Sequence, residues 1–195
     1  MEMEQAYMTT GGYRRSNIHP KKFALWVGMA SITMMFAAFT SAYIVRQAAG
    51  NWLEFELPSL FFVSTAVILL SSASLHGGYL AFKGGREKLY KGLMVLTFLL
   101  GIAFVVLQYQ GWQALAASGV ELTTNPSGSF VYVISGIHAA HVLGGIAALV
   151  VALIHAFALP FRFSPARKLR FELTATYWHF VDLLWLYLLF FFLFQ

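Results

Sequence analysis

Apolar residues in this chain gather into five long runs separated by short polar segments. The runs cover residues 23–45, 59–82, 92–112, 129–157 and 173–194. Each run has the ~20 residues that an α-helix needs to cross the hydrocarbon core of a bilayer. The polar segments between the runs are too short to fold a soluble domain with its own core. The pattern therefore predicts an all-α, polytopic membrane protein with five transmembrane helices in a single domain, residues 23–195.

The composition supports a membrane protein and narrows its chemistry. Hydrophobic residues make up 59% of the chain and charged residues 11%, with a mean hydropathy of +0.69. The chain contains no cysteine, which excludes a disulfide, an iron–sulfur cluster and a thiolate-bound metal. The pI near 9.6 comes from charges beside the apolar runs, so we expect anionic lipid head groups as partners and no nucleic acid.

Positive charge is distributed unevenly between the two sides of the expected bundle. Arg46 stands alone on one side, and the other side holds twelve of the Lys and Arg residues: Arg14, Arg15, Lys21, Lys22, Lys83, Arg86, Lys88, Lys91, Arg162, Arg167, Lys168 and Arg170. Short segments rich in Lys and Arg are retained in the cytoplasm. The asymmetry predicts an N-terminus inside, residues 1–22 as a cytoplasmic tail, and a C-terminus outside.

Two further sets of residues suggest contacts. Small residues recur every fourth position in the fourth run and predict a close helix-packing stripe: Gly136, Ala140, Gly144 and Ala148. The basic residues of the last polar segment are candidates for binding lipid head groups: Arg162, Arg167, Lys168 and Arg170.

The last two runs contain ionisable residues at membrane depth. Asp182 lies near the middle of its run, where an isolated carboxylate costs roughly 2.5–3.5 kcal/mol on insertion scales. Such a residue needs a partner, and His141 on the preceding antiparallel run comes to a similar depth. We therefore expect a His–Asp contact within a structural polar-aromatic cluster of the following residues: His138, His141, Trp178, His179, Asp182 and Trp185.

The residues alone leave several roles open for this cluster. A hydrogen-bond network that fixes helix register is the simplest role. A proton-coupled carrier would use Asp182. A small haem b anchor would use His141 and His179. The 14-residue spacing of His141 and His155 would suit two stacked haems, but no second helix offers the matching pair of histidines that two haems require. A zinc site would need three or four ligands. No phosphate-binding loop, carboxylate pair or nucleophile elbow is present, so no catalytic residue and no metal site are expected.

Two of the runs carry motifs of a known family. Residues 177–185 read Tyr-Trp-His-Phe-Val-Asp-Leu-Leu-Trp and residues 136–145 read Gly-Ile-His-Ala-Ala-His-Val-Leu-Gly-Gly. These motifs, together with Leu107-Gln108 and Trp112, resemble subunit III of the haem-copper respiratory oxidases. The resemblance extends over residues 23–195, and the five helices are similar to the short bacterial form, which lacks the first two helices of the longer version.

The resemblance implies an accessory subunit without cofactors in the cytoplasmic (inner) membrane of a bacterium. It would pack against subunit I, which carries haem and copper, with subunit II in the same complex. Its role would be to support proton uptake by a proton-pumping terminal oxidase, and it would bind phospholipid. Residues 34–43 favour the cytochrome c oxidase branch, with a quinol oxidase or a nitric oxide reductase as alternatives. A larger respiratory assembly is a further partner that the resemblance allows. Residues 29–33 lack the acidic residue that many members place there, and the missing helices would have formed one wall of the family's lipid cleft.

Overall fold

The computed structural model describes residues 19–123, 125–160 and 164–194 of the chain. These residues form five helices: α2 (Pro20–Ala48), α3 (Ser59–Lys83), α4 (Glu87–Ala117), α5 (Pro126–Ala158) and α6 (Pro165–Phe194). All five are long and apolar enough to cross a membrane, which confirms the predicted all-α, five-span fold. Most helices reach beyond the apolar runs, because Lys, Arg and Glu extend a helix as readily as Leu does.

The α2 helix begins within the segment predicted as a tail, residues 1–22. Pro20 occupies the first turn of α2, where its fixed φ suits a helix start. The preceding residue, His19, caps the helix, because its Nδ1 accepts a hydrogen bond from the Lys21 amide at 3.2 Å. Residues 20–22 are therefore helical, and residues 1–18 lie outside the described part of the chain.

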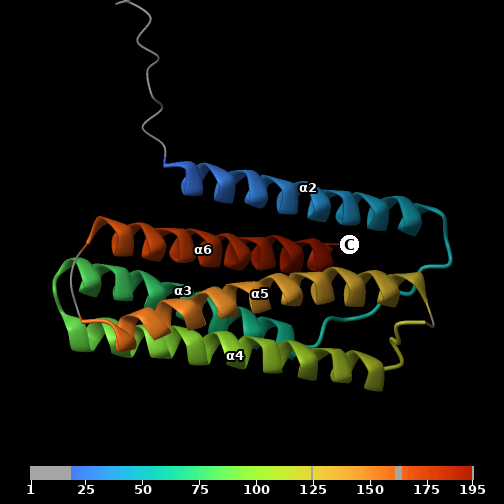
Figure 1. The fold of residues 1–195 in the computed structure, drawn as a ribbon. Helices are drawn as coiled ribbons and strands as arrows, with labels where there is room; N and C mark the ends of the chain where they lie inside the picture. The colour runs from blue at the N-terminus through green and yellow to red at the C-terminus, as the bar shows by residue number, and fades with distance from the viewer. Residues whose placement is uncertain (1–18, 124, 161–163, 195) are drawn as a thin grey trace, which may run out of the picture.

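The α3 and α4 helices form an antiparallel hairpin (Figure 1). Their short connection contains Gly85 at a φ of +70°, a left-handed conformation that is costly for other residues. Tight turns of this kind place consecutive helices side by side. The hairpin gives the bundle a rigid pair against which the later helices pack.

The α6 helix lies inside the bundle, where it contacts α2, α3 and α5 (Figure 1). Two tryptophans of α6, Trp178 and Trp185, are among the largest fully buried side chains. By contrast, α2 lies at the edge and buries only Phe36, Thr40 and Tyr43. The interior of the protein is thus built around α6, and α2 covers one side of it.

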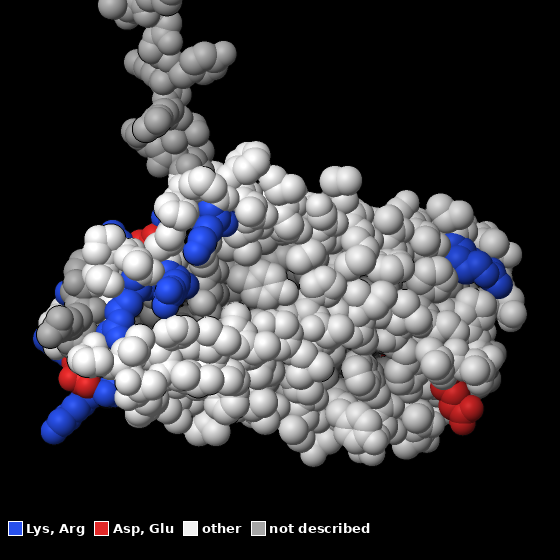
Figure 2. All heavy atoms as spheres, viewed as in Figure 1, with Lys and Arg blue, Asp and Glu red and all other residues white. Residues whose placement is uncertain are grey.

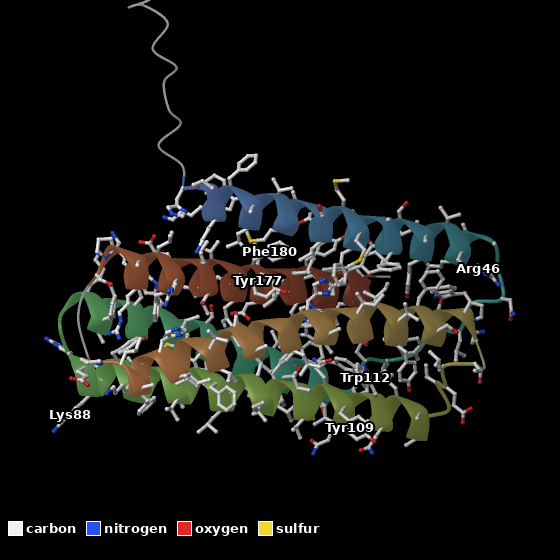
Figure 3. All side chains as sticks on the ribbon, viewed as in Figure 1. Arg46, Lys88, Tyr109, Trp112, Tyr177 and Phe180 are labelled. Carbon is white, nitrogen blue, oxygen red and sulfur yellow. The ribbon has the colours of Figure 1, made fainter. Side chains whose placement is uncertain are left out.

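The charged residues on the visible surface lie at the ends of the bundle (Figure 2). In the view of Figure 2, Lys and Arg gather mainly at one end, and the middle shows neither charge. The beginning of α2, the α3–α4 turn and the beginning of α6 all lie at this basic end (Figure 1). Lys88 lies at the basic end and Arg46 at the opposite end (Figure 3). The charge-free middle has the character of a membrane-embedded surface.

Candidate functional site

Trp178 is held at the centre of the bundle by two glycines from neighbouring helices. A Cβ atom built on Gly101 of α4 would lie 2.7 Å from its Cη2 atom, and one on Gly145 of α5 would lie 3.0 Å from its Cε3 atom. The indole N–H donates to the Ser71 hydroxyl of α3 at 3.2 Å. Trp178 therefore joins four helices and leaves no space for a larger residue at either glycine.

Trp185 and His138 form the second part of the interior. Their rings stack with centroids 5.2 Å apart, and the Trp185 indole donates to the Thr65 hydroxyl at 2.8 Å. His138 is fully buried, and neither of its ring nitrogens has a hydrogen-bond partner among the described residues. Phe36 and Phe104 contact the same imidazole edge-on. Aromatic packing, not hydrogen bonding, thus positions His138.

His141 and His179 face away from this interior and away from each other. The His141 Nδ1 pairs with the Ile137 carbonyl of its own helix at 2.8 Å, and its ring contacts Phe36 of α2. The His179 Nδ1 forms a short hydrogen bond with the Ser72 hydroxyl of α3. Residues three apart on a helix differ by about 60° in direction. His141 therefore reaches Phe36 of α2, whereas the sequence predicts a contact with Asp182.

Asp182 is 3% exposed and lies near the middle of α6. Neither carboxyl oxygen has a full hydrogen bond within the described part of the chain, although the Ser72 hydroxyl lies beside it. The predicted His–Asp contact is therefore wrong for the described residues. His141 turns toward α2, and Ser72 uses its hydroxyl to bind His179.

The alternatives that need several ligands find no support in this geometry. Across the described residues, no group of three His, Cys, Asp or Glu side chains is placed to hold a metal ion. To bind one haem between them, the His141 and His179 rings would have to point into the same space. The His141 ring instead faces α2, and the His179 ring faces α3. His155, which stands 14 residues after His141, has its Nδ1 paired with the Val151 carbonyl at 2.7 Å.

The small-residue stripe on α5 is mostly left uncovered by the described helices, although a Cβ atom on Gly144 would lie 3.6 Å from the Tyr177 hydroxyl of α6. Ala140 and Gly144 are exposed, and a Cβ atom on Gly136 would meet nothing within 4 Å. Ala148 is half-buried in a groove beside α6. The predicted helix-packing role of this stripe therefore stays a prediction, and the closest approach to Trp178 of α6 uses Gly145.

Sequence reasoning missed the hydroxyl groups that complete the interior. Gln108 of α4 donates to the Ser64 hydroxyl of α3 at 2.9 Å, and Trp112 donates to the Ser135 hydroxyl of α5 at 2.9 Å. Trp112 is labelled on α4 in Figure 3. The signal for the Gln108 contact is the serines at one side of the second apolar run, since buried hydroxyls in a membrane protein need partners.

A groove opens between α5 and α6 at the basic end. Its volume is about 320 Å³, and its walls are mostly apolar side chains such as Ala152, Phe171 and Leu173, with Arg167 and Arg170 among the lining residues. Lys168, another head-group candidate, instead lies 3.7 Å from the Glu172 carboxylate. The remaining candidate, Arg162, lies outside the described residues.

The fold and the site define an integral membrane protein whose interior is held by aromatic packing and interhelical hydrogen bonds. A family model described as cytochrome c oxidase subunit III matches residues 22–195. The probable cytochrome c oxidase subunit 3 of Nocardia farcinica (strain IFM 10152) is 32% identical, over 82% of this chain and 80% of the relative. That of Mycobacterium tuberculosis (strain ATCC 25618 / H37Rv) is 30% identical, over 94% of this chain and 95% of the relative. The cytochrome c oxidase subunit 3 of Corynebacterium diphtheriae is 31% identical, over 78% and 77%. The chain belongs to the cytochrome c oxidase subunit III family.

Proposed function

We propose that this chain is the accessory subunit III of a proton-pumping cytochrome c oxidase in a bacterial cytoplasmic membrane. It packs against the main subunit, which carries the haem and copper centres, with subunit II in the same complex. The family match over residues 22–195 carries this proposal. The described residues add that the interior is used for packing: Trp178 and Trp185 bind hydroxyls of α3, and His138 stacks on Trp185.

The role of such a subunit is to stabilise the main subunit and to support its proton uptake during turnover. The basic end of the bundle fits the cytoplasmic side by the positive-inside rule, and this orientation is part of the proposal. The cluster of His138, Trp178, Asp182 and Trp185 then holds the helices in register, while His141 and His179 pack toward α2 and α3.

A difference spectrum of the purified complex tests the proposal. The tagged chain is isolated in mild detergent, and its reduced-minus-oxidised absorbance is recorded before and after a harsher wash that strips its partners. We expect a haem a signal before the wash and no haem signal on the stripped chain. A b-type signal on the stripped chain would contradict the proposal and favour a haem anchor. Oxidation of reduced cytochrome c, compared with a quinol, by the unstripped complex identifies the electron donor.

We also propose that the groove between α5 and α6 binds a phospholipid of the same membrane. One acyl chain fits its apolar walls, and the Arg167 and Arg170 guanidinium groups at the groove suit an anionic head group. The Arg167 Nη1 already donates to the Pro160 carbonyl at 2.7 Å, which fixes the position of this charge.

Lipid analysis of the purified chain tests this second proposal. Arg167→Gln with Arg170→Gln should lower the anionic phospholipid retained after detergent exchange by at least about tenfold, since each head-group charge contributes roughly 1 kcal/mol. Lys88→Gln with Lys83→Gln removes two charges at the same end of the bundle but outside the groove, and should change retention little. Equal losses in both double variants would show a general charge effect and no site.

A further inference from the structure

A row of polar side chains follows the outward face between α3 and α6. We call it the α3–α6 polar face, and it consists of Ser72, His76, Tyr79, Glu172, Thr176 and His179. All of these except Ser72 line one shallow pocket of about 200 Å³ together with Ala175. Ser72 adjoins the pocket through its hydrogen bond to His179. The face therefore presents hydroxyl, imidazole and carboxyl groups in one continuous strip.

The deeper half of this face lies within the membrane. His76 stands seven residues before Lys83, the last residue of α3, and a rise of 1.5 Å per residue places it about 10 Å inside the helix end. His179 stands nine residues after Arg170 on α6, which places it roughly 13 Å beyond that charge. At these depths, hydrocarbon chains offer no hydrogen-bond partner.

The two imidazoles of the face are close to each other and open to the outside. Their ring centroids are 6.4 Å apart; His76 is exposed and His179 is half-buried. Outward positions on the same two helices are apolar, as Leu70 with 61% exposure and Leu183 with 67% exposure illustrate. The polar groups therefore form a local exception on a lipid-like surface, which is expensive unless a polar partner covers it.

The Glu172 carboxylate at the rim of the face is already paired within this chain. The Glu172 carboxylate pairs with the Lys22 ammonium at 2.7 Å and accepts a hydrogen bond from the Tyr79 hydroxyl at 3.1 Å. Lys168 approaches the same carboxylate at 3.7 Å. A partner thus gains little from a cation placed at Glu172 and gains most from neutral hydrogen-bonding side chains at the deeper imidazoles.

We propose that the α3–α6 polar face is the surface through which this chain docks onto a transmembrane helix of the main oxidase subunit. That helix presents neutral donors and acceptors, such as Ser, Thr, Asn or Tyr side chains, at the depth of His76 and His179. This inference rests on the proposed function, because it names the surface that the accessory subunit uses. Interhelical hydrogen bonds from Ser, Thr and His are the usual polar contacts between membrane helices.

Site-specific photocrosslinking in the full complex tests the surface. A benzoylphenylalanine replaces Thr176 of the face or Ala73, the exposed residue that follows Ser72 on α3. The exposed Leu99 and Val106 on α4 are the matched control positions. Membranes that contain all subunits are irradiated, and adducts are identified by mass spectrometry. We expect adducts to a spanning helix of the main subunit from positions 73 and 176, at least about tenfold above those from positions 99 and 106.

Three results overturn the inference: main-subunit adducts from the α4 positions alone, adducts from the face only to a second copy of this chain, or adducts from the face only to lipid. The proposed function fails separately, when the unmodified chain retains no haem a signal in mild detergent. A chain that retains the signal but crosslinks elsewhere disproves the docking surface alone.

Substitution of one imidazole provides an independent readout. His76→Leu should lower the main subunit retained after a stringent detergent wash by about three- to fifteen-fold, the effect of losing one or two membrane hydrogen bonds. His76→Asn keeps a hydrogen-bonding group and should restore most of the retention. Tyr109→Leu, at an exposed position of α4, is the control and should change nothing. Retention that is equal in His76→Leu and the unsubstituted chain would contradict a polar contact at this residue.

Discussion

Gly101→Ala is the sharpest test of how Trp178 holds the bundle together. The new Cβ atom would lie 2.7 Å from Trp178 Cη2, closer than Cβ atoms approach other heavy atoms in proteins, and 3.1 Å from Cζ2, which is also tight. The indole cannot move away easily, because its N–H is bound to Ser71 and its other edge packs on Gly145. Overpacking of this kind costs about 1–3 kcal/mol.

Gly92→Ala on the same helix is the matched control. A Cβ atom at Gly92 would meet nothing within 4 Å. Both substitutions gain the same helix propensity, about 0.8–1.0 kcal/mol in water, so the difference between them isolates the clash with Trp178. We expect the free energy of unfolding of Gly101→Ala to be lower than that of Gly92→Ala by about 1–3 kcal/mol.

The assay is unfolding of the purified chain in mixed micelles by titration with SDS, followed by far-ultraviolet circular dichroism. The same pair of substitutions is then measured in a Trp178→Phe background, where the smaller ring removes the clashing atoms. The penalty of Gly101→Ala should fall below about 0.5 kcal/mol there, as expected for two residues coupled by direct contact. Equal stabilities of the two alanine variants, or a penalty that persists undiminished in the Trp178→Phe background, would refute the reasoning.

Three further predictions concern polar groups. Asp182→Asn should leave oxygen consumption per haem of the assembled oxidase unchanged, because Asp182 has no full hydrogen bond among the described residues. An oxygen electrode measures this rate, and a large loss of turnover would assign the carboxyl a part in the chemistry. A double-mutant cycle of Trp112→Phe with Ser135→Ala should give a coupling of about 0.6 kcal/mol in SDS unfolding, the average for membrane hydrogen bonds, and zero coupling would show that the 2.9 Å contact stabilises nothing. Lys22→Gln should lower the free energy of unfolding by less than about 1 kcal/mol, because the ion pair of Lys22 with Glu172 is partly exposed. The loss should disappear in SDS unfolding at high salt, which screens the pair. A loss that persists in high salt would indicate a different cause.

The number, order and approximate limits of the helices are predictable from the sequence. Five apolar runs of membrane length allow few other arrangements, since backbone polar groups in lipid must be satisfied within helices. The motif around Trp178 and Trp185 also indicates the family through its residue types and spacing. These features depend on local composition and spacing, which a single sequence contains.

Helix rotation could not be predicted from the same information. His138 and His141 stand three residues apart, yet the first is buried against Trp185 and the second turns toward Phe36. The small residues of α5 illustrate the same limit: Gly144 is exposed and Gly145 packs on Trp178. Adjacent glycines are equivalent in sequence, and only the position of a neighbouring helix distinguishes them.

The edge position of α2 has a consequence for how the protein is made. This helix is synthesised before the other four described helices, yet among them it packs only on α5 and α6, the two that follow latest. Its hydroxyl contact between Thr40 and Tyr187, 2.8 Å long, joins residues 147 positions apart. Because folding proceeds from the N-terminus during synthesis, α2 has to wait in the bilayer while the α3–α4 hairpin closes. Docking of α2 is therefore a late step in the assembly of this bundle, because it needs α5 and α6 in place.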